Sequence, residues 1–345
     1  MNLRHGRWLP WAGGLLALAA FLAYGPGSEP LFGDRAYLAY MGQVVGRGEP
    51  LYTATSFGYP PLAPLLSGVA IRLGSLAGIP SFFSPRILAG LCFVLTGVLV
   101  AQLGRRMALP FAGLGAVVVF AGLAVPARLA ATGLEPKALA ALATLATALA
   151  AARGRWLLAG ISAGLGASSW HPAVALFGAL LVLAPLLARR APEDRADPGP
   201  ASLRWRPVLA VALGGALGML PAVLYLQATG SWRRLWLQAV VLKSARLASE
   251  VPFPGLDVLK RLLVSTASEV VFLGLAVLGA CWLGWHLSRK RKPLGEVLPA
   301  PDGTGLVGWS LAWGLVLAFD CQGAADLLPV LPLLALWAGL GLAAA

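Results

Sequence analysis

Long apolar stretches recur along almost the whole chain, and they restrict it to a helical protein embedded in a membrane. A membrane helix needs roughly 17–25 mostly apolar residues, and about ten stretches approach or meet this length: 8–24, 87–103, 110–127, 136–152, 156–170, 172–188, 208–227, 268–286, 306–320 and 327–344. Only 12% of the residues are charged, compared with about 25% in a soluble domain. The sequence therefore predicts an all-α polytopic membrane protein with a single transmembrane domain over residues 1–345.

The basic residues predict how the chain is oriented. The net charge of +13 does not indicate a nucleic-acid partner, because the basic clusters flank apolar stretches, as orientation signals do in membrane proteins. These clusters all fall on the cytoplasmic side if the N-terminus is cytoplasmic and residues 59–77 lie in the outer leaflet without crossing. We therefore expect an integral protein of a bacterial plasma membrane.

This orientation leaves two large segments outside the membrane, residues 25–86 and 228–267. Each contains a stretch with apolar residues at helical spacing, 34–47 in the first and 231–247 in the second. Tryptophan and arginine beside the second apolar stripe are typical of a helix lying at the membrane surface. Residues 191–206 are predicted to form a cytoplasmic linker. The sequence thus predicts amphipathic juxtamembrane helices in both outer loops.

Two acidic residues at the predicted outer boundary are the candidates for catalysis. Asp34 could cap the helix that follows it, or its carboxylate could accept a proton from an attacking hydroxyl. Glu135 precedes Pro136 at the start of a later apolar stretch, where its negative charge would interact favourably with the helix dipole. Alternatively, Asp34 and Glu135 could together bind a sugar hydroxyl or a divalent cation, and the sequence indicates no other cofactor.

Further outer residues are candidates for substrate binding. His171 is either a structural polar group or a ligand for a sugar or phosphate, and Asp326 either serves the site or forms a salt bridge to an outer arginine. Lys243 and Arg246 share one helical face, and they either reach toward lipid headgroups or bind a lipid-linked phosphate. Arg86 is a weaker candidate for the same phosphate. Tyr59 is either an interfacial anchor or a sugar-stacking surface.

Several of these segments together resemble the GT-C superfamily of membrane glycosyltransferases, including the protein O-mannosyltransferases and the aminoarabinose transferases. The resemblance is strongest over the first half of the chain. It is carried by Asp34 in the first outer loop, Gly48-Glu49-Pro50-Leu51-Tyr52, Tyr59-Pro60-Pro61-Leu62, Ser84-Pro85-Arg86, Leu134-Glu135-Pro136-Lys137, Trp170-His171-Pro172 and the later Asp326-Leu327-Leu328-Pro329. The chain departs from the mannosyltransferases at Arg35, which stands where they have a second acid.

The resemblance implies a sugar donor carried on a polyprenyl phosphate and an acceptor hydroxyl on a glycan, lipid or protein. It implies attack on the anomeric carbon with inversion, with Asp34 as the general base. Glu135 and His171 would position the sugar, and Lys243 and Arg246 would hold the departing lipid phosphate. The alternatives are a transporter or flippase for a lipid-linked sugar and a non-catalytic membrane subunit.

Overall fold

Every regular element in the described part of the chain is a helix. The computed structural model describes residues 8–28, 30–31, 34–55, 58–106, 112–188, 205–241, 302–320 and 324–344. The helices are α1 (Leu9–Ala23), α2 (Asp34–Gly46), α3 (Leu51–Ala54), α4 (Leu62–Leu76), α5 (Ser84–Arg106), α6 (Ala112–Gly122), α7 (Ala124–Thr132), α8 (Pro136–Ala152), α9 (Trp156–Ser169), α10 (Val174–Ala188), α11 (Arg206–Ala228), α12 (Trp232–Trp236), α17 (Asp302–Asp320) and α18 (Leu331–Ala344). Short turns of 3₁₀-helix cover His171–Ala173 and Ala324–Leu327.

The apolar stretches fold into helices close to the predicted boundaries. Within the described residues, α5 and α11 are long and apolar enough to cross a membrane, and the bent pair of α6 and α7 would make a third such span. The other apolar helices are shorter. The stretch 268–286 lies outside the described residues. The helices therefore support a polytopic membrane fold.

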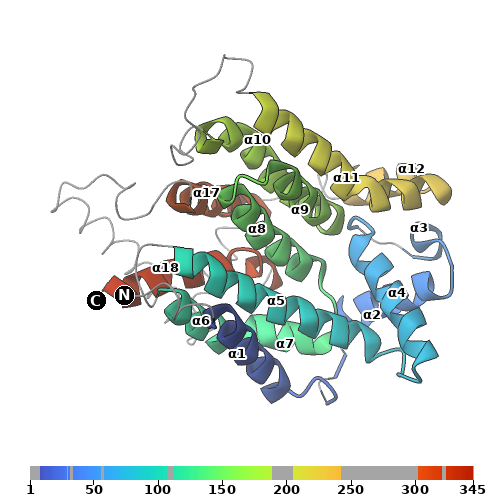
Figure 1. The fold of residues 1–345 in the computed structure, drawn as a ribbon. Helices are drawn as coiled ribbons and strands as arrows, with labels where there is room; N and C mark the ends of the chain where they lie inside the picture. The colour runs from blue at the N-terminus through green and yellow to red at the C-terminus, as the bar shows by residue number, and fades with distance from the viewer. Residues whose placement is uncertain are drawn as a thin grey trace.

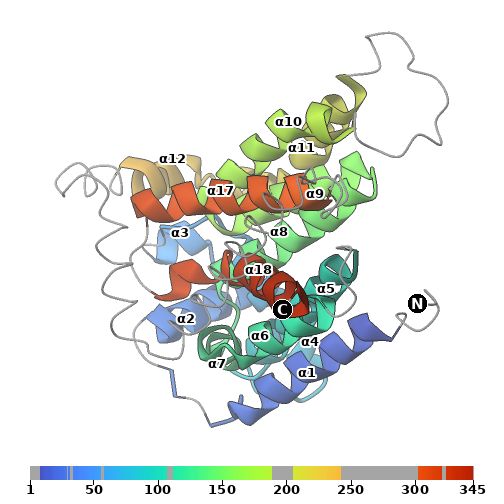
Figure 2. The ribbon, with the colours of Figure 1, turned by 90° about the vertical axis from the view of Figure 1, so that its left-hand side faces the viewer.

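The long helices run between two ends of the molecule, and the outer-loop helices gather at one of them. Figure 1 shows α2, α3, α4 and α12 together at this end. Figure 2 shows α17 lying beside α8 and α10, and α18 against α6. We call the end that carries α2, α3 and α4 the outer end, following the predicted orientation.

The apolar stretch 110–127 does not form one continuous helix, because the structure breaks the helix at Leu123. Leu123 has extended backbone angles, φ −72° and ψ 120°, and α6 and α7 meet at a bend of 59°. Pro126 explains the break: in a continuous helix its ring would clash with the carbonyl of Gly122, four residues earlier, and it has no N–H to donate. The bend directs α7 toward Glu135.

Helices α9 and α11 pack closely against each other through glycines. A Cβ atom added to Gly214 would lie 2.2 Å from the carbonyl oxygen of Leu157, and one added to Gly160 would lie 2.3 Å from that of Val211. Small residues at such spacing let two helix backbones approach closely in a membrane. The close contact fixes α11, which leads directly to α12 at the outer end.

The first outer loop contains the two helices expected of it. The helix predicted over 34–47 is confirmed as α2, and the helix predicted within 59–77 is confirmed as α4 (Leu62–Leu76). The two helices pack side by side at the outer end. In the second outer loop, α12 and the π-turn Leu237–Val241 follow the predicted start at 231. Residues 242–267 lie outside the described part.

Tyrosines tie this loop to the end of α11. The backbone N–H of Leu51, at the start of α3, donates to the Tyr225 hydroxyl of α11 at 2.8 Å. The buried Tyr52 hydroxyl donates to the carbonyl of Tyr59 at 2.5 Å. Arg234 of α12 also reaches the carbonyl of Tyr52 at 3.4 Å. These contacts place the Tyr59 backbone relative to the membrane helices.

Candidate active site

Glu135 lies in the short link between α7 and α8. Gly133 enters this link with φ +144°, a conformation that side chains disfavour and glycine adopts readily. Glu135 occupies the N-cap position of α8, but its side chain makes no capping hydrogen bond. The residue is 7% exposed. The link therefore holds the Glu135 carboxyl in the protein interior, where this carboxyl does not cap the helix.

The surroundings of Glu135 favour its neutral form. Burial raises the pKa of the Glu135 carboxyl above its ordinary value, Lys137 opposes this rise, and Asp34 adds to it. Arg35 lowers the pKa and Asp326 raises it, with smaller effects. A neutral carboxyl can donate a hydrogen bond as well as accept one. Glu135 is therefore suited to bind a hydroxyl group.

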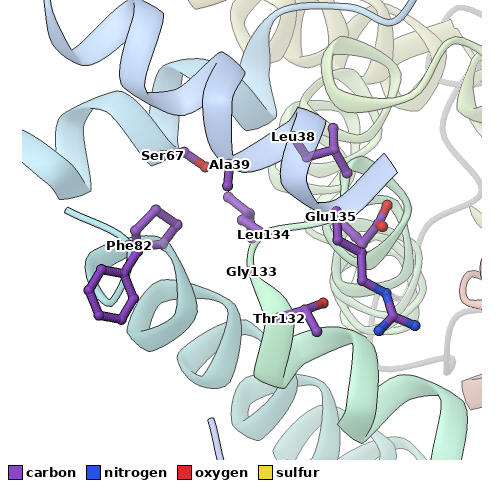
Figure 3. Close-up of a pocket in the computed structure, with 10 residues that line it drawn as sticks. Leu38, Ala39, Ser67, Phe82, Thr132, Gly133, Leu134 and Glu135 are labelled. Atoms are coloured by element: carbon purple, nitrogen blue, oxygen red, sulfur yellow. The ribbon is translucent and has the colours of Figure 1, made fainter. Parts of the chain in front are cut away.

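A half-open pocket borders Glu135. Its cavity volume is about 10 Å³, about the room that one water molecule needs, and its mouth is open to solvent. Figure 3 shows the link Gly133–Leu134–Glu135 passing beside Leu38 and Ala39 of α2, with Phe82 on the other side of Leu134. Arg35 also lines the pocket. The pocket thus has charged groups at Arg35 and Glu135 and apolar side chains along most of its wall.

Asp34 is the first residue of α2 and is exposed. Its negative charge in the first turn interacts favourably with the helix dipole. Asp34 does not line the pocket, whereas its neighbour Arg35 does. The charge of Asp34 nevertheless acts on both Glu135 and Tyr59. The two predicted acids are therefore neighbours at the outer end, one exposed and one buried.

Asp326 forms a salt bridge with Lys137. The Lys137 Nζ atom lies 2.8 Å from Asp326 Oδ1, and the two side chains are 12% and 6% exposed. The same ammonium lies 5.9 Å from the ring centroids of Tyr59 and Trp170. The structure thus gives Asp326 a pairing role beside the candidate acids.

Tyr59 and His171 come together at this place. Their ring centroids are 6.3 Å apart, with the planes tilted by 37°. His171 opens the turn between α9 and α10. Burial raises the pKa of the Tyr59 phenol, which Lys137 lowers and Asp326, Glu135 and Asp34 raise. The charges of these four residues therefore all act on the Tyr59 phenol.

Arg86 is the one predicted phosphate-binding residue that lies within the described part of the chain. It is 4% exposed, and its Nη1 donates to the carbonyl of Pro26 at 2.5 Å. This contact fixes the first outer loop and occupies one nitrogen of the guanidinium, and the predicted role of Arg86 at a lipid phosphate stays a prediction. Lys243 and Arg246 lie outside the described residues, so their predicted role is untested.

Sequence reasoning missed Lys137 and Arg35 as members of the site. In the sequence, Lys137 appears only as the last residue of the segment Leu134-Glu135-Pro136-Lys137, and Arg35 only as a departure from the mannosyltransferase pattern. Their partners come from distant parts of the sequence, so no local spacing pairs them. We define the acidic cluster as Asp34, Glu135 and Asp326 together with Lys137 and Arg35.

The structure does not support a metal site built from several protein ligands. Within the described ranges, no group of three or more His, Cys, Asp or Glu side chains is close enough together to hold a metal ion. The divalent cation suggested for Asp34 and Glu135 stays a prediction, and no chemical step is assigned to it below.

The comparisons with known proteins give a match in structure but not in sequence. No family model matches the chain, and no curated protein matches it in sequence. ArnT from Cupriavidus metallidurans, solved with undecaprenyl phosphate, matches with a TM-score of 0.67 and 16% identity over 96% of this chain and 59% of its own. The oligosaccharyltransferase AglB from Archaeoglobus fulgidus, solved with an inhibitory peptide and a dolichol-phosphate, matches with a TM-score of 0.54 and 13% identity.

The match to AglB covers 99% of this chain and 50% of AglB. Another structure of the Archaeoglobus fulgidus oligosaccharyltransferase, tethered to an acceptor peptide, has a TM-score of 0.53 at 12% identity. The chain thus spans about half to three-fifths of the solved proteins that it matches. At these identities the comparisons establish architecture alone: the chain shares the fold of ArnT and AglB, which supports the GT-C resemblance at the level of the fold.

Proposed function

We propose that this protein is a membrane glycosyltransferase. It moves a sugar from a polyprenyl-phosphate donor to an acceptor hydroxyl on the non-cytoplasmic side of the membrane. The fold shared with ArnT and AglB, which were solved with lipid phosphates, supports this class of donor. The acceptor is a hydroxyl of a glycan, a lipid or a protein.

In the proposed reaction, the acceptor oxygen attacks the anomeric carbon of the donor sugar. The bond from that carbon to the phosphate oxygen breaks, and polyprenyl phosphate leaves with the electron pair. Asp34 takes the proton from the attacking hydroxyl, a role that suits an exposed carboxylate in the outer loop. Attack from the face opposite the phosphate inverts the anomeric configuration.

The remaining predicted residues serve to bind the substrates. The buried Glu135 carboxyl hydrogen-bonds a sugar hydroxyl, assisted by His171. Lys243 and Arg246 hold the phosphate as it departs, since cationic side chains stabilise charge that develops on a leaving group. Tyr59 provides an aromatic surface for the sugar ring.

The proposal rests on two acids that lie near each other at the outer end, the exposed Asp34 and the buried Glu135. Asp34 and Glu135 come from different helices, and the charge of one acts on the carboxyl of the other. Glu135 also lines the pocket that opens toward solvent at this end. A non-catalytic subunit would not require a buried acid beside an open pocket.

The test is release of polyprenyl phosphate from defined donors. The purified protein is reconstituted in vesicles with a panel of undecaprenyl-phosphate sugars and a mixed acceptor extract, with and without a chelator. Positioned acid–base groups contribute roughly 10²–10⁴-fold to rate, so Asp34→Asn should lower turnover by about 10²-fold or more. Glu49→Gln is the matched control, because Glu49 lies in the same loop and forms an exposed ion pair with Arg47 at 3.7 Å.

The outcomes separate the three candidate functions. Release that depends on Asp34 and Glu135 supports the transferase. Movement of intact donor between leaflets without release indicates a transporter or flippase. Neither release nor movement, together with unchanged behaviour of Asp34→Asn and Glu135→Gln in cells, leaves the non-catalytic subunit and refutes the enzyme.

A further inference from the structure

Lys137 occupies a position that ordinarily disfavours a positive charge. It is the second residue of α8, and the N-terminal end of a helix carries a partial positive charge of its own. Its side chain is 12% exposed, so most of its hydration is lost as well. A helix start selected for stability alone would have an acidic residue here. The placement of this lysine therefore needs another explanation.

Three groups from distant parts of the chain surround the ammonium. Asp326, in the turn before α18, binds it at 2.8 Å. The rings of Tyr59 and Trp170 face it at 5.9 Å each, within the range of a cation–π interaction. These contacts join the first outer loop, the end of α9 and the C-terminal segment at one point.

The Trp170 side chain is held firmly in place by the residues around it. It is 1% exposed and stacks on Trp313 of α17 with centroids 5.4 Å apart and planes 9° from parallel. The indole N–H of Trp313 donates to the Thr144 hydroxyl of α8 at 3.0 Å. Trp170 and Asp326 thus fix where the Lys137 ammonium lies.

Tyr59 is the group that comes from the first outer loop. Its carbonyl accepts the Tyr52 hydroxyl, which holds its backbone. Its ring centroid lies 5.9 Å from the Lys137 ammonium and 6.3 Å from the His171 ring. Since the backbone is held separately, Lys137 acts mainly on the orientation of the ring.

We propose that Lys137, fixed in place by Asp326, is a positioning residue of the transfer reaction: it orients the Tyr59 ring as a wall of the sugar-binding site beside Glu135. This inference rests on the proposed function. Lys137 does not hold the lipid phosphate, because its charge is already balanced by Asp326. Buried ion pairs can often be replaced by apolar residues without loss of stability, so stability alone does not account for the pair.

The experiment compares variants that remove or preserve the charge. Lys137→Met and Asp326→Asn remove one partner, whereas Lys137→Arg and Asp326→Glu preserve it. We measure kcat and KM for release of undecaprenyl phosphate from the donor that the wild type uses, and the Kd for undecaprenyl phosphate alone. We expect kcat to fall at least tenfold in Lys137→Met, substantial recovery in Lys137→Arg, and a Kd within twofold of wild type.

A double-mutant cycle tests whether Lys137 acts through Tyr59. If it does, Lys137→Met combined with Tyr59→Leu should be no slower than the slower single variant, because residues that act as a unit are not additive. Glu49→Gln, at the exposed ion pair with Arg47, should leave all constants unchanged. Additive losses in the cycle would overturn the proposal.

Two further results would also overturn it. Wild-type kcat in Lys137→Met, with only a lower melting temperature, would make the pair a structural link. A tenfold weaker Kd for undecaprenyl phosphate would make Lys137 a phosphate ligand. A wild-type protein that neither binds undecaprenyl phosphate nor uses any donor refutes the proposed function and, with it, this inference, whereas an active wild type with unaffected variants refutes the inference alone.

Discussion

The glycine contact between α9 and α11 allows a sharp prediction for Gly214→Ala. The new Cβ would lie 2.2 Å from the carbonyl oxygen of Leu157 and 2.9 Å from the backbone nitrogen of Ile161. Because both neighbours are backbone atoms of another helix, no side chain can rotate away. Unstrained carbon–oxygen contacts are about 3.3–3.6 Å, so the two helices must separate by about 1 Å or distort.

The expected cost follows from two opposing effects. Adding a methyl group to a filled contact costs about 1–3 kcal/mol, and alanine regains up to about 1 kcal/mol over glycine in helix propensity. Because the new Cβ meets backbone that cannot rotate away, the cost lies in the upper part of this range, about 2–3 kcal/mol, and the net destabilisation is about 1–2 kcal/mol. The shift in melting temperature is about 2–4 °C per kcal/mol for a domain of roughly 150–250 residues and smaller for a longer chain, so the expected fall is at most about 2–8 °C.

Thermal unfolding in detergent, followed by intrinsic tryptophan fluorescence, measures this fall. Gly178→Ala is the matched control, because Gly178 lies within α10 and a Cβ added there meets nothing within 4 Å. The control should keep or slightly raise the melting temperature. If Gly214→Ala melts at or above the temperature of Gly178→Ala, the close backbone contact of α9 and α11 is wrong.

Three more predictions follow from single contacts. Tyr52→Phe removes the donor to the Tyr59 carbonyl and should cost about 0.5–1.5 kcal/mol of unfolding free energy, measured by thermal unfolding against wild type. Gly133→Ala has room for its Cβ, so the backbone conformation alone, φ +144° and ψ −174°, should destabilise the protein by about 1–3 kcal/mol; an unchanged melting temperature would contradict the strained link. For Glu135, burial raises the folded-state pKa above its ordinary value of 4.5. Ionisation of this carboxyl therefore opposes folding as pH rises through the folded-state pKa. Glu135→Gln should melt above wild type at about pH 8, and this difference in melting temperature should vanish near pH 4. A difference independent of pH would show that Glu135 does not titrate as described.

The helices of this fold could be predicted largely because their signals are local. Apolar spacing and length located the outer helix over 34–47, observed as Asp34–Gly46, and most of the long membrane stretches. The break at Leu123 also had a local signal in Pro126, which the length of the apolar stretch concealed. Hydropathy averages over a window, whereas a proline acts on a single turn of helix.

The candidate site was only partly accessible to the same reasoning. Asp34 and Glu135 stood out because acids at the ends of apolar stretches are unusual. The pairing of Lys137 with Asp326 had no such signal, because it depends on how α8 and the turn before α18 meet in space. Likewise, no local pattern indicated the hydrogen bond from Arg86 to the carbonyl of Pro26.

The tyrosine contacts of the first outer loop bear on the order in which this protein matures at the ribosome. Chains emerge from the N-terminus, and their early parts generally fold first. Yet Leu51 needs the hydroxyl of Tyr225, and the lysine that faces Tyr59 needs the carboxylate of Asp326. The first outer loop is translated early, but its contacts with these later residues form late. A nascent chain therefore cannot form all contacts of the candidate site until nearly all of these 345 residues have been inserted.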